Sequence, residues 1–246
     1  MKKRSNIEIQ IRNALSEVLI LSLESSEKSV LLHSVFCFCR LVKGKEQSKV
    51  ELTDLLEHQE DMGRVRLSWK EIAEELSSLA IVEMDSENSI QIGRQFTNYL
   101  PDICVRVERY RKFISGLYSR GGKFKDGIEG EIKKGILLFN EGLYFECHEF
   151  LEGVWRKEKG KEKSFLQGLI YSAVAFYHVE YKNYGGAARY LNRSCLRLRE
   201  FKPAFLSVDV EAFLADMWDY LGLLEKSSFD ALGILKSAIP IIKLME

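Results

Sequence analysis

The sequence predicts a mainly α protein in two parts, a small N-terminal domain with one β-hairpin and a C-terminal helical bundle. Apolar residues recur at helical spacing along most of the 246 residues, and only three prolines interrupt the chain. Apolar and polar residues alternate instead at 80–84 and 89–92, which predicts the hairpin. The length exceeds the roughly 100–200 residues of a typical domain, which favours two domains over one.

The composition is that of an ordinary globular protein and excludes several classes. Apolar residues make up 46% and charged residues 29%, which excludes disordered and collagen-like chains. Lys plus Arg and Asp plus Glu are equal at 36 each, so overall charge does not direct the chain to nucleic acid or to an anionic membrane. The cysteines contain no CxxC pair and are expected to be reduced thiols; they are Cys37, Cys39, Cys104, Cys147 and Cys195.

Neither a secretion signal nor a membrane segment is expected. Glu8, Arg12 and Glu17 interrupt the apolar run that a signal peptide would need. The longest uncharged stretch, 164–179, is shorter than the roughly 20 apolar residues of a membrane helix. The sequence therefore predicts a cytoplasmic protein with no membrane partner.

The first domain, residues 1–100, is expected to be winged-helix-like. A polar loop at 43–49 follows its second helix, and its last helix begins at a capping box in which Glu71 follows Ser68 by three residues. Helices followed by a hairpin in this order resemble a winged helix. The expected elements are helices at 7–23, 29–41, 49–57 and 69–78 and strands at 80–84 and 89–92.

The charge of the helix at 69–78 argues against DNA binding. In a winged helix it would enter the major groove, yet it carries Glu71, Glu74 and Glu75 against Lys70. Carboxylates repel phosphates, so we expect this domain to serve packing or protein contact, with DNA binding as the less favoured alternative.

Residues 101–126 are expected to form a basic connecting helix and a joint at Gly121 and Gly122. The helix itself is expected at 105–118, and it carries the basic cluster of the chain. The simplest interpretation is a solvated helix face. The alternative is a nucleic-acid contact through Arg106, Arg109, Arg111 and Lys112.

The C-terminal bundle, residues 127–246, is expected to begin with two helical hairpins whose turns lie at 140–142 and 182–186. A shift of 40 residues places Tyr144 over Tyr184, which is typical of tetratricopeptide-like helix pairs. The expected helices run from 127 to 139, 144 to 157, 164 to 181 and 187 to 201, with further helices around 213–221 and at 231–242, the last broken by Pro240.

Residues 139–156 carry a His-Glu motif, FNEGLYFECHEFLEGVWR. Together with FLQGLI at 165–170 and the residues from 183 to 187, this motif resembles the helical family catalogued as domain of unknown function 309. The resemblance covers about residues 127–201 and implies a compact all-helical domain, with no established activity to transfer. Cys147, where the family usually has alanine, departs from its pattern. The signature positions are Tyr144, His148, Glu149, Glu152, Trp155, Arg156, Gln167, Gly168, Asn183 and Gly186.

Helical geometry predicts how the motif residues are arranged. At about 100° per residue, His148 and Glu152 share one face of their helix, whereas Glu149 lies about 100° away from His148. Gln167, Tyr171 and His178 share a face of the next helix by the same arithmetic. If the two faces meet, they form a buried, internally hydrogen-bonded cluster of His148, Glu152, Gln167, Tyr171 and His178.

Besides a structural polar pair, the motif leaves three kinds of chemistry open. A metal site would use His148, Glu152 and His178, although the second histidine of an HExxH helix and the Glu-x-x-His pairs of di-iron bundles are missing. Metal-free catalysis would make His148 a general base oriented by Glu152. A small-ligand pocket would use the same residues. The candidate catalytic residues are His148, Glu149, Glu152, Tyr171 and His178.

We expect a non-catalytic protein-interaction or scaffold module whose His-Glu cluster is structural. Paired helices commonly present a groove to a partner, and an acidic winged-helix-like domain fits a protein contact better than DNA. The expected contact anchors are Tyr177, Tyr181, Tyr184 and Tyr190. No cofactor is expected; the alternative function is a metal-dependent hydrolase-type site with a divalent metal at His148, Glu152 and His178.

Overall fold

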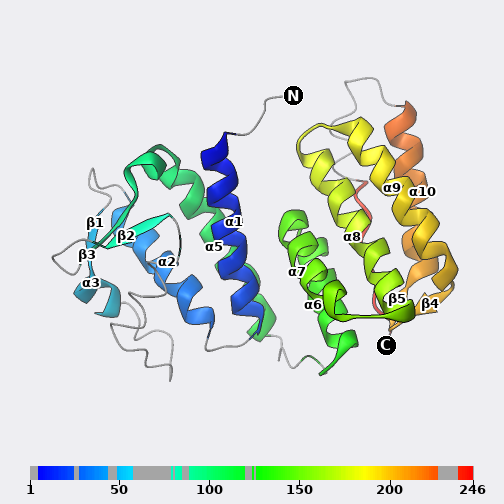
Figure 1. Cartoon of the computed structure of the whole chain (residues 1–246), viewed down its shortest axis with the longest axis horizontal. Coiled ribbons are helices and arrows are strands. Elements are labelled where there is room, and N and C mark those ends of the chain that lie inside the picture. The colour runs from blue at the N-terminus through cyan, green and yellow to red at the C-terminus, as the bar shows by residue number, and fades with distance from the viewer. Residues whose placement is uncertain are drawn as a thin grey trace. The chain divides into compact units, whose positions relative to one another are not determined.

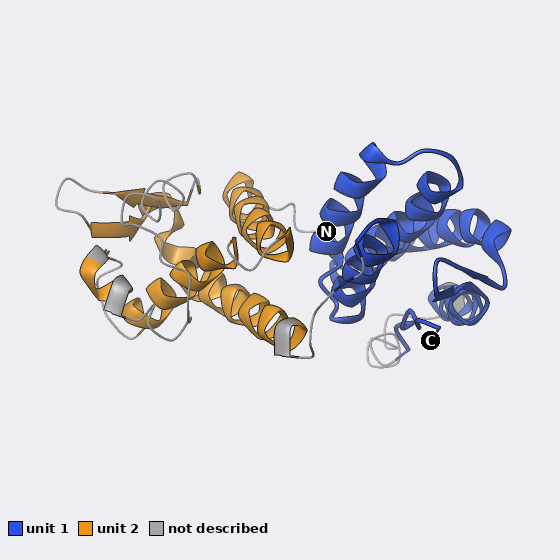
Figure 2. Cartoon of the chain, turned by 90° about the horizontal axis from the view of Figure 1, so that it is seen from below, with its two compact units in different colours: residues 1, 123–246 blue, residues 2–122 orange. Residues whose placement is uncertain are grey.

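The computed structural model describes residues 5–24, 28–43, 49–57, 79, 81–84, 89–119, 124, 126–226 and 238–245. The chain is mainly helical, as predicted. It divides into two compact units between Gly122 and Lys123, called here the N-terminal unit and the C-terminal unit (Figure 2). None of the described helices combines the length and the apolar character needed to cross a bilayer.

Three helices form the core of the N-terminal unit. They are α1 (Asn6–Glu24), α2 (Ser29–Val42) and α5 (Leu100–Ser119), and each contacts the other two (Figure 1). Leu19, Phe38 and Tyr110, one from each helix, are buried. Helix α5 contains the helix expected to connect the two domains, and it packs within this unit because its apolar face completes the core.

A small antiparallel sheet completes the N-terminal unit. Its strands are β1 (Lys49–Glu51), β2 (Val82–Met84) and β3 (Ser89–Ile92) in the order β1-β3-β2. The predicted hairpin is confirmed, because Met84 pairs with Ile90. A short 3₁₀ helix, η2 (Arg94–Tyr99), then leads into α5.

The single helix expected at 49–57 is wrong in its first turn. Residues Lys49–Glu51 form β1, which pairs with β3 and buries Val50, and only Leu52–Glu57 form a helix, α3. The pairing of β1 with a strand forty residues later in the chain has no signal in a local sequence window. The helix expected at 69–78, with its capping box, lies outside the described residues.

The C-terminal unit is a row of helices in which each packs against the next along the chain (Figure 1). They are α6 (Ile128–Asn140), α7 (Tyr144–Lys157), α8 (Gly160–Glu180), α9 (Tyr184–Leu198) and α10 (Val210–Lys226), with a 3₁₀ turn, η3 (Arg199–Phe201), after α9. The bounds of α7 agree with the prediction. Helix α8 begins at Gly160, four residues before the expected start at 164, because the Lys and Glu residues of this segment are good helix formers.

The turns after α6 and α8 have the same backbone geometry. Gly142 and Lys182 both adopt the left-handed conformation, with φ of 68° and 55°. The next N–H in each turn, that of Leu143 or Asn183, donates to a carbonyl five residues earlier at 2.9 Å. This is the Schellman arrangement of helix ends. The two turns, which lie 40 residues apart in the sequence, therefore have the same backbone structure.

Interlocking rings fill the core of the C-terminal unit. Phe139 contacts Tyr144, Phe176 and Phe213 edge-on, with ring centroids 5.3, 5.4 and 5.7 Å apart. Helices α8 and α9 approach closely where α8 carries Gly168, because a Cβ there would lie 2.5 Å from Leu198 Cδ2. The absence of a side chain at Gly168 thus allows α8 and α9 to lie close together.

Residues 238–245 are not helical, so the helix predicted at 231–242 is wrong in its last part. A hairpin of β4 (Ala204–Phe205) and β5 (Val208–Asp209) precedes α10, and Leu244 pairs with Val208. Residues 238–242 are not helical; residues 231–237 lie outside the described residues. Pro240 interrupts helical hydrogen bonding, and the backbone of Ile242 is instead bonded to the Asn140 side chain.

Candidate functional site

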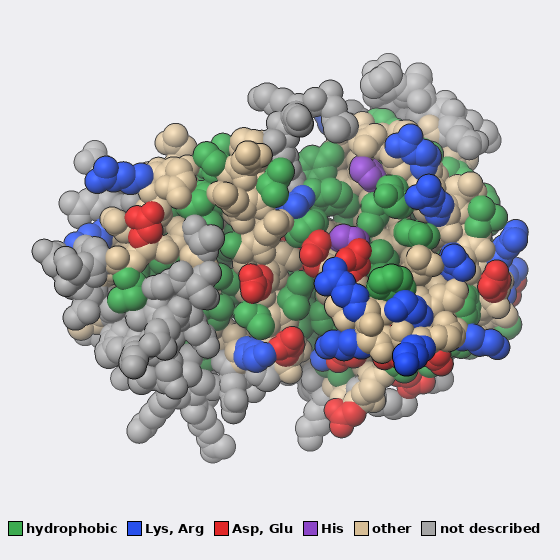
Figure 3. Space-filling view, in the orientation of Figure 1, with side chains coloured by type: hydrophobic (Ala, Val, Ile, Leu, Met, Phe, Trp, Pro, Cys, Tyr) green, Lys and Arg blue, Asp and Glu red, His purple; other side chains and the backbone are tan. Residues whose placement is uncertain are grey.

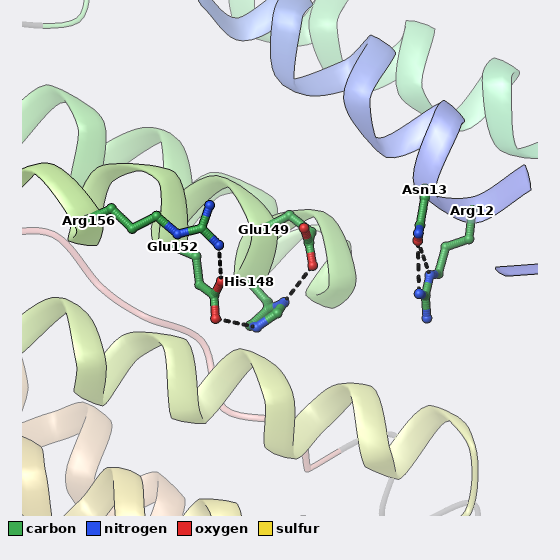
Figure 4. Close-up of polar contacts among 6 residues, drawn as sticks. All are labelled: Arg12, Asn13, His148, Glu149, Glu152 and Arg156. Carbon is green, nitrogen blue, oxygen red and sulfur yellow. Dashed lines mark hydrogen bonds and ion pairs between the residues drawn. The ribbon is translucent and has the colours of Figure 1, made fainter. Parts of the chain in front are cut away.

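The polar side chains of the His-Glu motif form a chain of contacts along one helix, α7 (Figure 4). His148 Nε2 lies 3.2 Å from Glu152 Oε1, and His148 Nδ1 lies 3.1 Å from Glu149 Oε1. Arg156 Nη2 donates to Glu152 Oε2 at 3.0 Å. We call His148, Glu149, Glu152 and Arg156 the polar array.

The structure agrees with the predicted His148–Glu152 contact in the polar array and adds a contact that was not predicted. His148 and Glu152 converge as their spacing of one helical turn predicts. Glu149 follows His148 directly and so lies about 100° around the helix from it, as expected, but its contact with His148 was not predicted. The Glu149 carboxylate contacts His148 Nδ1, because the two methylene groups of the glutamate side chain allow the carboxylate to bend toward His148 along the helix surface.

The polar array lies at the surface of α7, and the contacts described above join residues of this one helix. The side chains of His148, Glu149 and Glu152 are 24%, 43% and 34% exposed, and all their contacts above are with residues of α7. Exposed pairs one turn apart stabilise a helix by only about 0.3–0.5 kcal/mol each. The array therefore contributes little to the stability of the bundle.

His178 belongs to a separate motif at the turn between α8 and α9. Its Nδ1 accepts a hydrogen bond from Asn183 Nδ2 at 2.9 Å, and Asn183 Oδ1 accepts one from the N–H of Gly186 at 3.2 Å. The Gly186 contact fixes which end of the Asn183 amide faces His178, so the proton of the neutral imidazole is assigned to Nε2. Burial, followed by the charge of Arg189, lowers the pKa of His178 and favours this neutral form.

This turn explains two of the signature positions. Asn183 is the N-cap of α9, and the Gly186 amide that it binds lies in the first turn of that helix. A Cβ at Gly186 would lie 2.6 Å from Asn183 Nδ2, so the close approach requires glycine. Helix α9 therefore begins at Tyr184 and not, as expected, at Ala187.

The predicted buried cluster of His148, Glu152, Gln167, Tyr171 and His178 is not formed. His148 and Glu152 contact one another, His178 is bonded to Asn183, and Tyr171 contacts the ring of Tyr190. Gln167 lies half-buried on α8. The reason is that each histidine finds its hydrogen-bond partners on its own helix or in the adjoining turn.

Aromatic and imidazole rings connect the polar array to the His178 turn. Phe145 contacts His148 and Tyr177, with ring centroids 6.3 and 5.7 Å apart. Tyr177 contacts Tyr181 at 4.9 Å, and His178 stacks on Tyr190 at 5.5 Å with an interplanar angle of 23°. These rings are half-buried or exposed, and we call them the ring surface: Phe145, His148, Tyr171, Tyr177, His178, Tyr181 and Tyr190.

The ring surface spans helices α7, α8 and α9. Figure 3 shows His side chains of the C-terminal unit on one face, among hydrophobic side chains and with Lys and Arg side chains close by. Tyr177 and His178 are adjacent on α8 and their rings also contact each other, at 6.3 Å. The surface is therefore continuous from Phe145 on α7 to Tyr190 on α9.

Sequence reasoning identified the ring surface only in part. Tyr177, Tyr181 and Tyr190 were expected as contact anchors and belong to it, whereas the hydroxyl of Tyr184, the fourth, is buried. Phe145 was missed. Its signal was the spacing of three from His148, which places the two rings on neighbouring positions of one helix face.

The other signature residues have structural positions. Tyr144 is buried against Phe139, and Gly168 allows the close contact of α8 with Leu198. Trp155 is half-buried, and the Lys163 ammonium lies 4.2 Å from its ring centroid, a cation–π distance. These residues support the helices that carry the ring surface.

The geometry does not assemble the predicted metal ligands. Among the described residues, no group of three or more His, Cys, Asp or Glu side chains could hold a metal ion. Both ring nitrogens of His148 face carboxylates, and Nδ1 of His178 is bonded to Asn183. A divalent metal at His148, Glu152 and His178 stays a prediction, which elemental analysis of the purified protein and of its His148→Ala variant tests.

The basic residues of α5 are partly neutralised. Arg111 donates to both carboxylate oxygens of Glu108, at 3.2 and 3.3 Å, and Lys112 lies 3.6 Å from the same group. The hydrogen bond from Arg111 is the main reason why the pKa of Glu108 is lowered. Arg111 also lies 4.4 Å above the Phe36 ring of α2. The predicted nucleic-acid contact through Arg106, Arg109, Arg111 and Lys112 stays a prediction.

Comparisons with known proteins agree with the resemblance predicted from the sequence. Residues 132–190 match the family model described as domain of unknown function (DUF309). The chain is also similar to the uncharacterized protein YpuF of Bacillus subtilis (strain 168), with 44% identity over 52 residues. The aligned segment is 21% of this chain and spans only 30% of that relative. No solved structure matches the chain.

Proposed function

We propose that the C-terminal unit is a protein-interaction module that binds its partner through the ring surface. The observation that carries the proposal is a continuous set of ring contacts across α7, α8 and α9 that remains partly open to solvent. A different set of rings, around Phe139 and Phe176, fills the core. Tyrosine and histidine combine an apolar body with a polar tip, a combination that suits interfaces.

Charged side chains of both signs border the ring surface. On α9, the Arg193 guanidinium lies 5.5 Å from the Tyr190 centroid, and Arg189 is close enough to lower the pKa of His178, although burial is the larger cause. On α7, Glu149 and Glu152 border Phe145 and His148. An apolar centre with a polar rim is the usual anatomy of an interface. The partner that fits carries apolar side chains for the rings and an acidic group for the α9 side.

The polar array belongs to this rim in our proposal and is not the structural cluster that the sequence suggested. The three contacts described above lie within α7 and are partly exposed, so each contributes only a little to stability. They place the carboxylates of Glu149 and Glu152 beside His148. Pre-organised polar groups reduce the entropy that is lost when a partner binds.

The position of His148 favours binding over acid-base catalysis. A general base needs one ring nitrogen free to take a proton from the substrate. Here Nδ1 and Nε2 lie 3.1 and 3.2 Å from the carboxylates of Glu149 and Glu152. Neither nitrogen is therefore directed at a substrate in this arrangement.

We also propose the finer architecture of both units. The matching turns at Gly142 and Lys182 support tetratricopeptide-like helix pairs in the C-terminal unit. The sheet order β1-β3-β2, with β1 between α2 and α3, supports a winged-helix-like N-terminal unit. The pairing of Arg111 and Lys112 with Glu108 makes protein contact the favoured role of that unit.

Affinity capture with matched variants tests the proposed function. The exposed side chains of Tyr181 on the ring surface and Trp218 on α10 are comparable, at 40% and 45% exposure. We expect a protein captured by the wild-type chain and by Trp218→Ser, and depleted at least tenfold by Tyr181→Ser combined with Arg193→Ala. Capture of the same proteins by all three chains would show that the ring surface is not the binding site.

A further inference from the structure

Residues 238–245, called here the C-terminal segment, are held by hydrogen bonds to their backbone. The side chain of Asn140, at the end of α6, makes two of them with Ile242. Asn140 Oδ1 accepts from the Ile242 N–H at 2.9 Å, and Asn140 Nδ2 donates to the Ile242 carbonyl at 2.9 Å. An amide side chain offers one acceptor and one donor, so it matches the two backbone groups of one extended residue.

Strand β5 and the turn before it also form backbone hydrogen bonds with the C-terminal segment. The N–H of Asp209 donates to the carbonyl of Lys243 at 3.1 Å, and the N–H of Met245 donates to the carbonyl of Ser207 at 2.8 Å. Val208 and Leu244 are paired as in an antiparallel ladder. The segment thus adds a strand to the β4–β5 hairpin, which is the geometry of β-augmentation.

The side chains of the segment alternate between buried and exposed, as in a β-strand. A peptide that binds in the same way therefore needs an apolar side chain at the position of Ile242. Ile242 is buried at 3% exposure, whereas its neighbours Ile241 and Lys243 are exposed. Backbone hydrogen bonds carry no sequence preference, and alternate side-chain pockets supply the specificity. An extended peptide with an apolar residue at the position of Ile242 satisfies the same contacts.

We propose that Asn140 and β5 form a peptide-binding site, filled in this chain by its own C-terminal segment, that accepts the same segment from a second copy. The identical sequence makes identical contacts, and the internal segment has only the advantage of its tether. Covalent attachment of a segment to its receptor raises its effective concentration at the site. The proposal does not rest on the ring surface, because none of the ring residues takes part in it.

A labelled peptide tests the site in the full-length chain. The probe is a synthetic peptide of residues 238–246 with a fluorophore at its N-terminus, and its binding is measured by fluorescence anisotropy. In the receptor Ile242→Asp, the internal segment carries a charge where the buried isoleucine was and no longer competes. We expect this receptor to bind the peptide at least tenfold more tightly than the wild-type chain does.

Two controls separate the site from unspecific binding. The double variant Ile242→Asp with Asn140→Ala lacks the paired hydrogen bonds and should lose binding at least tenfold. A peptide that itself carries Ile242→Asp should not bind. Equal binding to the single and double variants would overturn the proposal, as would no binding to an Ile242→Asp chain whose circular dichroism matches the wild type.

A second measurement applies if the Ile242→Asp chain is not folded. Hydrogen exchange of the wild-type chain then reports on the segment directly, compared with Asn140→Ala. We expect the amide of Ile242 to exchange at least tenfold faster in the variant, while amides in the centre of α8 are unchanged. Equal exchange at Ile242 in both chains would mean that Asn140 does not hold the segment, and the proposal would fail.

Discussion

Cys104 is the cysteine whose surroundings favour the reactive thiolate. Its pKa is lowered, chiefly by a hydrogen bond from Cys39 and further by the charge of Lys43, although burial opposes this. It is partly exposed, whereas Cys39, Cys147 and Cys195 are buried and their pKa values are raised. The thiolate is the form that attacks an alkylating reagent.

We therefore expect iodoacetamide to modify Cys104 at least tenfold faster than Cys39, Cys147 and Cys195 of the native chain. Mass spectrometry of the digested protein at successive times measures the rate at each site. The variant Cys104→Ser should lack the fast phase. A first modification at Cys147 or Cys195 would contradict this account of the thiols.

His178 makes the stability of the C-terminal unit depend on pH. Its neutral ring accepts the hydrogen bond from Asn183, and burial lowers its pKa in the folded chain. The pKa of an unfolded histidine is about 6.5. The stabilising contribution is therefore complete above about pH 6.5 and is lost as the pH falls through the lower folded pKa.

Thermal melts at about pH 7.5 and about pH 5 test this dependence. We expect the melting temperature of the wild-type chain to fall between the two pH values, and to fall less in His178→Gln, which does not titrate in this range. His148→Gln is the matched control, because its histidine lies outside the turn. An equal fall in wild type and His178→Gln would contradict the role given to His178.

At the scale of the helices, the contact between α8 and α9 depends on the absence of a side chain at Gly168. A Cβ there would lie 2.5 Å from Leu198 Cδ2 and 2.7 Å from Leu198 Cγ. We expect Gly168→Ala to lower the free energy of unfolding by about 1–3 kcal/mol, the usual cost of overpacking.

The matched control for this contact is Gly153→Ala on α7. A Cβ at Gly153 would meet nothing within 4 Å, so only helix propensity changes. We expect this variant to be stabilised by about 0.5–1 kcal/mol. Urea denaturation measures both variants, and equal effects would show that the contact at Leu198 is not tight.

The sequence was sufficient for elements whose signal is local. Helix α7 has both of its ends where its apolar spacing and flanking turns placed them. The β4–β5 hairpin was missed because its turn lacks the usual sequence signal. The turn residues Leu206 and Ser207 adopt positive φ, 48° and 61°, where glycine or asparagine is usually found. Strand β1 was missed because its partner lies far along the chain.

The candidate site shows the same limit at the level of side chains. The spacing of His148 and Glu152 was enough to predict their contact. The contact of Glu149 with His148 depends on the rotamer of the glutamate side chain. The hydrogen bond between His178 and Asn183 depends on the turn that brings the two residues together. Neither is fixed by helical periodicity.

At the scale of the whole molecule, each unit has its own core, and we expect the C-terminal unit to fold alone. The rings of Phe139, Phe176 and Tyr220 contact partners from that unit. A fragment of residues 123–246 should be helical and melt cooperatively, as independent domains do. Circular dichroism measures this, and an unfolded fragment would mean that its core requires the rest of the chain.

Site-specific photocrosslinking from the ring surface tests the central claim most directly. A benzophenone amino acid is placed at Tyr181 and, as the control, at Trp218, which is similarly exposed on α10. We expect a discrete protein adduct from position 181 in cells of the source organism and none from position 218. No adduct from position 181, or the same adduct from both positions, would contradict a binding role for the ring surface.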